Sequence, residues 1–398
     1  MMKLNFIDEL LDGVEIVWKR LGEVTTIKTG QSVSKQLIST NPGKYPVINS
    51  GREPLGFINK WNTDNDPIGI TTRGAGVGSI TWVESKYFRG NLNYSVTINS
   101  NQKINVRYLY HLLLEMQADI KALCTFVGIP ALNAGNLKEL KIPIPCPDNP
   151  EKSLEIQAEI VRILDTFTEL TAELTAELTA RKKQYAYYRE QLLSFEEGEV
   201  EWRVLGKISE YSKTRISSES LDGTNYVGVD NLLQDRMGKT ESNHVPKAGN
   251  STGYSVNDIL IGNIRPYLKK IWHADCEGGT NGDVLVIHPT DKNINPKYLF
   301  QVLADDKFFD YNMQHAKGAK MPRGNKNKIM EYPIPIPYPN NPIKSLAEQE
   351  RIVSILDKFD ALTSSITEGL PREIELRQKQ YEYYRNMLLS FPKEEVEK

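Results

Sequence analysis

The chain contains the stretch Ile142-Pro-Ile-Pro-Cys-Pro-Asp-Asn-Pro-Glu-Lys-Ser-Leu154 and repeats it as Ile334-Pro-Ile-Pro-Tyr-Pro-Asn-Asn-Pro-Ile-Lys-Ser-Leu346. The copies stay in register, 192 positions apart, as far as Leu170 and Leu362. Alternating proline fixes φ and removes backbone donors, so each run is expected to be extended and to lie outside any central strand. Ser153 and Ser345 then occur where the following helix needs an N-cap. The repeat predicts two similar domains, each followed by a helix.

Two further pairs of matched segments frame these domains. Arg181-x-Lys-Gln-Tyr-x-Tyr-Tyr-Arg-x-x-Leu-Leu-Ser-Phe195 matches the stretch from Arg377 to Phe391, now 196 positions apart. Trp18-Lys-Arg-Leu-Gly22 likewise matches Trp202-Arg-Val-Leu-Gly206. Both domains therefore start alike and end alike.

The segments between these marks predict an α+β fold. Short β-branched runs bounded by Gly, Asn and Pro predict strands, at 67–72, 78–83 and 94–98 in the first copy and at 258–261 and 283–287 in the second. Apolar spacing predicts helices over 106–123 and 296–309. We predict globular α/β domains at 1–152 (with an N-terminal helix, 1–17) and 198–344, separated by repeat helices at 153–197 and 345–398.

The repeat helices carry an apolar stripe in matching register, which predicts an antiparallel coiled coil. The seam residues are Ile160, Leu164, Phe167, Leu170, Leu174 and Leu178 in the first helix and Ile352, Leu356, Phe359, Leu362, Ile366 and Leu370 in the second. Thr-Ala-Glu-Leu occurs at 171–174 and again at 175–178, and one more four-residue step in the second copy explains the change of offset from 192 to 196. We expect such a step to keep the stripe nearly in place. Pro371 predicts a bend or a break, because proline inside a helix costs about 3 kcal/mol.

Composition excludes several protein classes. The chain of 398 residues is 39% hydrophobic and has no apolar run that approaches the roughly 20 residues of a membrane helix. Acidic residues interrupt the apolar N-terminus, so it is not expected to be a signal peptide. Cys124, Cys146 and Cys276 are isolated and lack metal-ligand spacing, which favours a reduced, cytoplasmic protein without structural zinc.

The net charge of −2 hides an alternation along the chain. Residues 1–150 carry a net +3, 151–201 a net −6, 202–342 a net +3 and 343–398 a net −2. This pattern permits polyanion binding by both domains without demonstrating it.

Catalytic signatures are absent from the sequence. The segment 235–240 resembles the end of a phosphate loop, but position 233 is Leu instead of the first Gly. Gly74-Ala-Gly76-Val-Gly78 begins like a dinucleotide fingerprint, yet no helix pattern follows, so a turn between strands is expected. The five histidines are scattered. We therefore expect neither catalytic residues nor a metal site, and a binding role.

The candidate binding residues lie beyond matched strands. Arg73 and Arg265 each follow an apolar strand, again 192 positions apart, and arginine can fork onto guanine or clamp a phosphate. A glycine-bearing basic run at 317–328 has a far less basic counterpart in the first copy. The alternatives are a structural salt bridge for the arginines and a solvated loop for the run. The predicted DNA-binding residues are Arg73, Asn263, Arg265, Tyr267, Lys269, Lys270, Lys317, Lys320, Arg323, Lys326 and Lys328.

The doubled motifs, with Thr-Ala-Glu-Leu units between them, resemble the specificity (S) subunit of type I restriction–modification systems over essentially the whole chain. The resemblance implies two target-recognition domains joined by an antiparallel coiled coil, and no catalysis by this chain. It also implies an asymmetric bipartite site in double-stranded DNA and, as partners, two methyltransferase (M) subunits and restriction (R) subunits. S-adenosylmethionine, ATP and Mg²⁺ would belong to those partners, with no cofactor in this chain.

Pro371 and the unequal helix lengths depart from an even repeat. Two other interpretations remain from the residues themselves. One is a subunit with its own methyltransferase or nuclease activity, and the other is a coiled-coil adaptor with two protein-binding heads and no role with DNA. Binding to duplex DNA that weakens steeply with salt would count against the adaptor.

Overall fold

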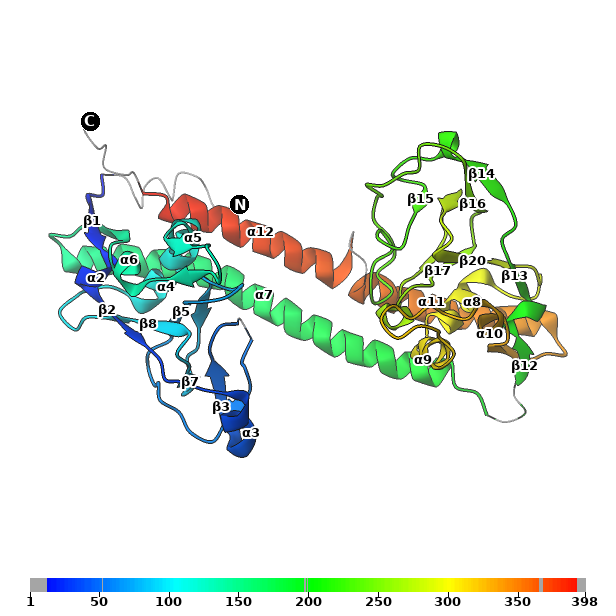
Figure 1. Ribbon diagram of the computed structural model, residues 1–398, viewed down its shortest axis with the longest axis horizontal. Coiled ribbons are helices and arrows are strands. Elements are labelled where there is room, and N and C mark those ends of the chain that lie inside the picture. The colour runs from blue at the N-terminus through cyan, green and yellow to red at the C-terminus, as the bar shows by residue number, and fades with distance from the viewer. Residues whose placement is uncertain (1–12, 52, 197, 199, 365–367, 392–398) are drawn as a thin grey trace. The chain divides into compact units, whose positions relative to one another are not determined.

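The computed structural model describes residues 13–51, 53–196, 198, 200–364 and 368–391, and the chain divides into two compact units. Unit 1 is the chain up to Thr171 together with the part from Arg377 onward, and unit 2 is Ala172–Leu376 (Figure 1). The predicted division at residues 152, 197 and 344 stays a prediction, because the units divide the chain inside its long helices. Among the described residues, no helix is both long enough and apolar enough to cross a membrane.

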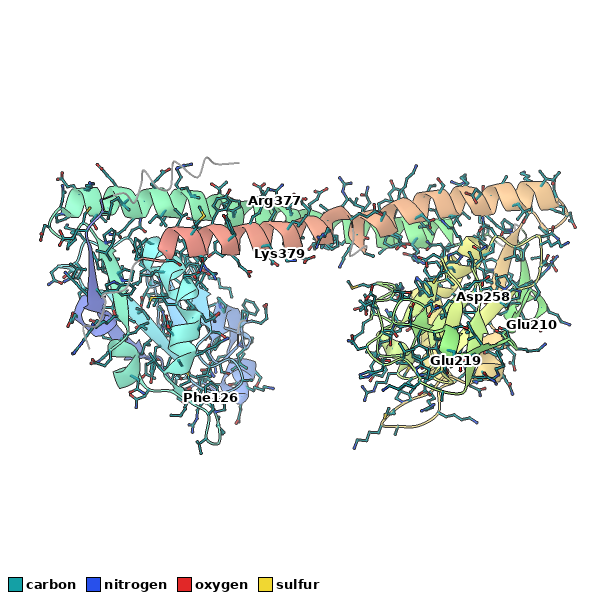
Figure 2. All side chains as sticks on the ribbon, turned by 90° about the horizontal axis from the view of Figure 1, so that it is seen from above. Phe126, Glu210, Glu219, Asp258, Arg377 and Lys379 are labelled. Atoms are coloured by element: carbon teal, nitrogen blue, oxygen red, sulfur yellow. The ribbon has the colours of Figure 1, made fainter. Side chains whose placement is uncertain are left out.

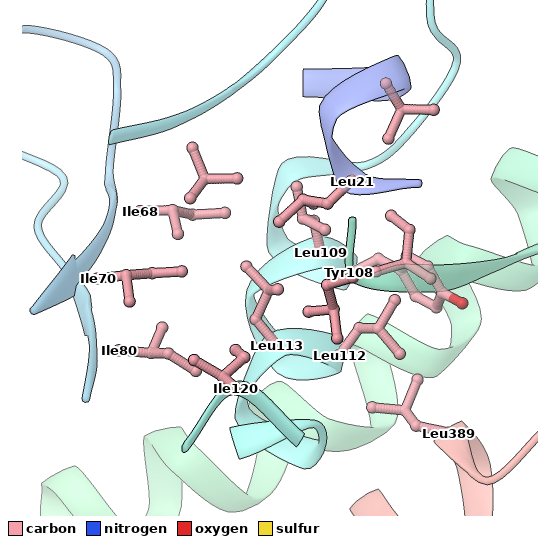
Figure 3. Packing of buried hydrophobic residues seen from close by; sticks show 14 of the residues in the cluster. Leu21, Ile68, Ile70, Ile80, Tyr108, Leu109, Leu112, Leu113, Ile120 and Leu389 are labelled. Carbon is pink, nitrogen blue, oxygen red and sulfur yellow. The ribbon is translucent and has the colours of Figure 1, made fainter. Parts of the chain in front are cut away.

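Unit 1 is built on an antiparallel sheet in the order β2 (Thr25–Thr29), β8 (Asn93–Ile98), β5 (Ile68–Thr71) and β6 (Ile80–Trp82). A smaller sheet has the order β4 (Phe57–Ile58), β3 (Pro42–Ile48) and β7 (Phe88–Arg89). Leu109 and Leu113 of α4 (Val106–Glu115) share a buried cluster with Ile68 and Ile70 of β5 (Figure 3). The other elements are α2 (Leu21–Val24), α3 (Lys35–Thr40), α5 (Gln117–Ala122), β9 (Cys124–Thr125), β10 (Ala131–Leu132) and α6 (Ala134–Lys138).

Unit 2 repeats this plan. Its main sheet has the corresponding order β13 (Ser209–Tyr211), β20 (Val284–Pro289), β17 (Ile259–Gly262) and β18 (Ile271–His273). A second sheet has the order β14 (Arg215–Ser217), β16 (Asn250–Tyr254), β19 (Gly278–Thr280) and β15 (Tyr226–Val227). The helices are α8 (Pro296–Leu303), α9 (Asp306–Gln314) and α10 (Lys326–Met330). The predicted α+β fold with two pseudo-repeated domains is confirmed. The helices predicted inside the domains, 106–123 and 296–309, are each divided into two shorter ones, α4 with α5 and α8 with α9.

The proline runs form edge strands, as predicted. β11 (Lys141–Pro145) pairs only with β1 (Ile16–Arg20), and β21 (Pro333–Pro337) pairs only with β12 (Val200–Val204), among the described strands. Trp18 lies opposite Pro143 and Trp202 opposite Pro335, which explains why the segments that open and close each domain are matched. The predicted N-terminal helix 1–17 is wrong at its end, where β1 already begins. Residues 1–12 of that prediction lie outside the described residues.

The predicted serine caps are wrong. α11 (Pro342–Thr363) begins one turn earlier than expected, with Asn341 as its N-cap. Ser345 is buried inside the helix, where its hydroxyl accepts a 3.0 Å hydrogen bond from the side chain of Gln349. The carbonyl oxygen of the same glutamine accepts from the backbone N–H of Asn295, which caps α8. Ser153, Gln157 and Asn105 repeat this arrangement in unit 1. The repeated Ser and Gln therefore join each helix to its own domain.

The two repeat helices differ in continuity. α7 (Pro150–Leu192) is one helix of 43 residues, whereas the second copy is divided into α11 and α12 (Gly369–Leu389). Gly369 has a φ of 73°, and a Cβ there would lie 2.3 Å from the carbonyl oxygen of Ala361. Pro371 lies in the first turn of α12, where its missing N–H leaves no helical bond unmade. The extra four-residue step is therefore part of a helix break and adds no turn to a continuous helix.

The second repeated block packs onto the domain of the opposite half of the chain. Leu388, Leu389 and Phe391 are buried in the core of unit 1, and Leu193 is buried in the core of unit 2. Phe167 and Tyr384 stack at 5.1 Å in unit 1, and Tyr185 stacks on Phe359 at 5.6 Å in unit 2. Early residues of α7 thus meet late residues of α12, while late residues of α7 meet α11. Within each unit the helical segments pair as an antiparallel arrangement requires.

The predicted seam residues differ in burial along the helices. Ile160, Leu164, Ile352 and Leu356 are fully buried against the domains. The half-buried members are Phe167, Leu170, Leu174, Leu178, Phe359, Leu362 and Leu370, and Ile366 lies outside the described residues. The apolar stripe therefore also holds each domain on its helix.

A buried histidine connects α4 to both helical segments of unit 1. His111 Nε2 lies 2.7 Å from Asp165 Oδ1, and its Nδ1 lies 2.9 Å from the hydroxyl of Tyr381. A neutral imidazole satisfies both contacts, since Nε2–H donates to the carboxylate and Nδ1 accepts from the phenol. Burial lowers the pKa of His111 to about 4, against the opposing effect of Asp165. At the corresponding place in unit 2, the amide of Gln301 donates to Asp357 and Asp360.

We expect this histidine to make unit 1 acid-sensitive. Its folded-state pKa lies below the ordinary value of about 6.5, so the unfolded chain binds the proton more readily and stability falls as pH drops from 6.5 towards 4. Between pH 7 and pH 5 the loss should be about 2 kcal/mol in urea denaturation. His111→Gln, which installs the residue used by unit 2, should remove most of this loss. An equal pH dependence in the variant would contradict the assignment.

Candidate nucleic-acid interface

Two stretches of unit 2 that are distant in the sequence meet beyond the end of β17. The first is 263–270, which includes a short 3-10 helix, Pro266–Leu268, and the second is the loop 317–323. The backbone N–H of Arg265 donates to the carbonyl of Pro322 at 2.7 Å. Two backbone bonds between Lys317 and Arg323, 2.9 and 2.8 Å long, close the loop. The fold thus brings the two predicted basic stretches together.

Several of the predicted DNA-binding side chains are exposed there. Among the described residues, no carboxylate pairs with these cations, so the salt-bridge alternative for the arginine gains no support in this part of the chain. Tyr267 is half exposed between them, and its ring is available for stacking. The exposed members without a carboxylate partner are Arg265, Tyr267, Lys317, Lys320 and Lys326, whereas Arg323 is exposed but paired with Asp283.

Two predicted lysines are engaged inside the unit. Lys269 Nζ lies 2.7 Å from Asp306 Oδ1, a carboxylate that also accepts from the guanidinium of Arg236. Lys270 donates to the carbonyl of Val229, and burial lowers the pKa of its ammonium group. Both lysines therefore have structural partners that hold the 263–270 segment in place.

Arg323 and Lys328 have partners that DNA could replace. Arg323 pairs with Asp283 and Lys328 with Glu331, both at 2.5 Å, but all four side chains are at least one-third exposed. Ion pairs this exposed are worth about 0–1 kcal/mol. Asn263 is buried, and its Oδ1 has no hydrogen-bond partner among the described residues. It cannot reach a base edge without a change in the loop.

Arg265 has an unusual backbone conformation. Its φ of 53° and ψ of 64° lie in the left-handed region, which costs a residue with a side chain roughly 1–2 kcal/mol. Gly74 occupies the corresponding place in unit 1, since it also has a positive φ and donates to the carbonyl of Pro130 at 2.9 Å. The predicted pairing of Arg265 with Arg73 is therefore shifted by one residue. The reason is a local offset of 191, which a comparison at 192 does not detect.

Arg73 is exposed beyond the end of β5, and no described carboxylate pairs with it. It forms a β-bridge with Ala131, so it lies beside the hairpin of β9 and β10. The loop of this hairpin, 126–130, corresponds to 318–322 of unit 2. Its side chains are apolar and exposed: Phe126 by 62%, Val127 by 97% and Ile129 by 63%.

Sequence reasoning missed this apolar loop because it looked for positive charge. The available signal was an apolar segment around Gly128, ending at Pro130, at a place where the second copy is basic. A second missed group is the set of lysines that lie over aromatic rings in and around the small sheet of unit 1, such as Lys86 over Trp61 at 4.4 Å. Among the described residues, no three His, Cys, Asp or Glu side chains gather in a metal-ligating group.

Known proteins show the same division into two similar domains. The family model described as "Type I restriction modification DNA specificity domain" matches residues 14–181 and 209–376, one copy for each domain. The chain is 36% identical to the Escherichia coli type I restriction enzyme EcoR124I/EcoR124II specificity subunit over 424 aligned positions, which cover 100% of this chain and 99% of that protein. It is 31% identical to the Escherichia coli EcoprrI specificity subunit, covering 92% of this chain and 93% of that protein.

A solved structure has the same fold. The S subunit of a type I restriction–modification system from M. genitalium superposes with a TM-score of 0.64, over 96% of this chain and 97% of that one. The two sequences are 19% identical, so this likeness concerns the fold alone.

Proposed function

We propose that this chain, which belongs to the type I restriction–modification DNA specificity family, binds double-stranded DNA and reads an asymmetric bipartite site. One observation carries the proposal. The main sheets of the two domains have the same strand order and the same Ser–Gln–Asn contacts to the repeat helices, yet the exposed residues at matching places differ. In unit 2 the place holds Arg265, Lys317 and Lys320, and in unit 1 it holds Arg73 beside an apolar loop. Two copies of one frame with unlike tips suit two unlike half-sites.

The chemistry of the exposed residues suits this role. Lysine and arginine contacts to phosphates would supply affinity and salt sensitivity, while arginine forked onto guanine would supply sequence choice. Arg265 is the best placed for a base contact, because its strained backbone directs it from a short, anchored turn. A strained residue at an exposed binding surface is a common sign of function.

We further propose that the chain itself performs no catalysis. It would carry two methyltransferase subunits and, where present, restriction subunits to the site, and S-adenosylmethionine, ATP and Mg²⁺ would be held by those partners. The complex would act in the cytoplasm. The matched Tyr, Arg and Leu residues that dock the helices already have structural partners, so recruitment would use other faces of the repeat helices.

The variant Arg265→Gly distinguishes a role of Arg265 in DNA sequence recognition from a role in the stability of unit 2. Glycine relieves the left-handed strain, so the variant should be about 0.5–1 kcal/mol more stable in unit 2 or unchanged. It should nevertheless lose discrimination at one half-site, by about 1–3 kcal/mol. Sequencing of methylated DNA from cells that express the variant with its M partner measures both halves of the motif. Equal loss at both halves, or an unchanged motif, would count against a reading role for Arg265.

The Thr-Ala-Glu-Leu repeat yields a prediction on half-site spacing. Residues 171–178 lie within α7 where the compact units divide, and four helical residues amount to about 6 Å and 40°. Since one base pair rises about 3.4 Å, deletion of 175–178 should shorten the spacer by one or two base pairs. Thr175→Ala, which keeps the length, should leave the spacer unchanged. An unchanged spacer in the deletion would refute the idea.

A further inference from the structure

The apolar loop of unit 1, residues 126–130, exposes large side chains that do not pack against the core of its own unit. Phe126, Val127 and Ile129 expose 62%, 97% and 63% of their surfaces, and these large side chains follow one another closely at the tip of a hairpin. Figure 2 shows Phe126 on the side of unit 1 that lies opposite the repeat helices α7 and α12. Grouped apolar side chains on a protein surface mark an interaction site more often than single ones do.

The loop is held firmly at its base. The β9–β10 pairing joins Thr125 to Ala131, and the hydroxyl of Thr125 donates to the carbonyl of Ala131 at 3.2 Å. The backbone N–H of Leu132 donates to Thr72 at 2.8 Å, which ties the hairpin to the segment that follows β5. The tip is thus presented on an anchored frame and does not fold back onto its own domain.

Comparison of the two units indicates what the tip contacts. A partner that binds both domains in the same way should meet the same chemistry twice. The matching loop 318–322 instead exposes Lys320 and Met321, flanked by Lys317, while the frame around it is repeated. The residue before the shared proline stays apolar, as Ile129 and Met321, while the large Val127 is matched by the small Ala319. A surface that differs on a repeated frame suits a ligand whose two halves differ, which is the DNA sequence.

We propose that the tip of loop 126–130 enters a groove of the duplex and packs its apolar side chains against the bases of one half-site. The proposal rests on the function proposed above. Apolar side chains contact thymine methyl groups, and Phe, Ile and Pro also act as wedges that unstack a base step. Arg73, beside the hairpin, would contact the adjacent phosphate. Unit 1 therefore reads its half-site largely through apolar contact, whereas unit 2 reads its half-site through Arg265 and gains affinity from its exposed lysines.

The test replaces Phe126, Val127 and Ile129 by serine in the full chain assembled with its M subunits. The probe is a duplex that carries the sequence methylated by the parent complex. The triple variant should bind it about tenfold or more weakly, and its methylation motif should lose information in one half-site. The slope of log affinity against log salt should not change, because no phosphate contact is removed. All three side chains are more than half exposed, so folding should be preserved. Val127→Ser alone is the mildest variant and should show the same trend.

The matched control is the double variant Lys317→Ser, Lys320→Ser in unit 2. It should weaken binding through charge, with a salt slope smaller by roughly two, and should leave the methylation motif unchanged in both half-sites, because phosphate contacts carry no sequence choice. If the triple variant kept the affinity and the methylation motif of the parent, the inference would be overturned. The proposed function would still stand, because it depends on the salt-dependent, sequence-specific binding of the parent complex. Loss of M subunits from the triple variant, while the variant chain alone binds the duplex as tightly as the parent chain alone, would also overturn the inference and assign the loop to protein contact. No sequence-specific binding by the parent complex would refute the proposed function itself.

Discussion

The exchange of helix ends between the two halves of the chain is the contact on which the rest of the structure depends. Leu389 belongs to the core of unit 1, whose other members come from the first 164 residues, α12 and Phe391. Leu193 has the same role in unit 2. Burial of a leucine is worth about 1.5–3 kcal/mol, and stacked rings and the contacts of Arg189 and Arg385 add to it. Each domain is therefore complete only when the repeat helix of the other half reaches it.

This exchange explains why the sequence is repeated where it is. Gln157 and Gln349 bind the residues that cap the domain helices, and Tyr381 and Tyr185 bind the polar groups beside them. Leu389 and Leu193 complete the cores of the two units. These residues were visible as matched positions before their partners were known. The positions of several strands and the extended, non-central proline runs also followed from local pattern, because alternation and proline act over a few residues. The order of the strands in each sheet became known only from the structure.

Other features depended on contacts that a single sequence does not display. Ser345 looked like a cap, but Asn341 captures the helix one turn earlier and the serine binds Gln349. The one-residue shift that matches Arg265 with Gly74 instead of Arg73 arises from a local offset of 191 between the copies. Lys269 and Lys270 looked free because their partners, Asp306 and Val229, are distant in sequence. Exposure of Phe126 was not predicted either, since apolar residues usually indicate a core and the comparison with the basic second copy was made for charge alone.

The chain repeats the residues that join each domain to the helices and varies the exposed loops beyond β5 and β17. Most of the residues that hold domain to helix are the same in both halves, because the same packing problem is solved twice, although His111 of unit 1 is matched by Gln301 in unit 2. Residues beyond β5 and β17 do not pack against the repeat helices and are free to differ. There the chain carries an apolar hairpin in one half and lysines in the other. Specificity can then change by alteration of the tips without loss of the frame.

Hydrogen exchange of Leu389→Ala and Leu193→Ala tests the exchange of helix ends most directly. Each substitution should cost about 2–5 kcal/mol in the core that it enters. Leu389→Ala should lower amide protection in α4 of unit 1 and leave α8 of unit 2 unchanged, and Leu193→Ala should do the reverse. If Leu389→Ala left α4 as protected as in the parent, or loosened α8 equally, the account of two domains completed by opposite helix ends would be contradicted.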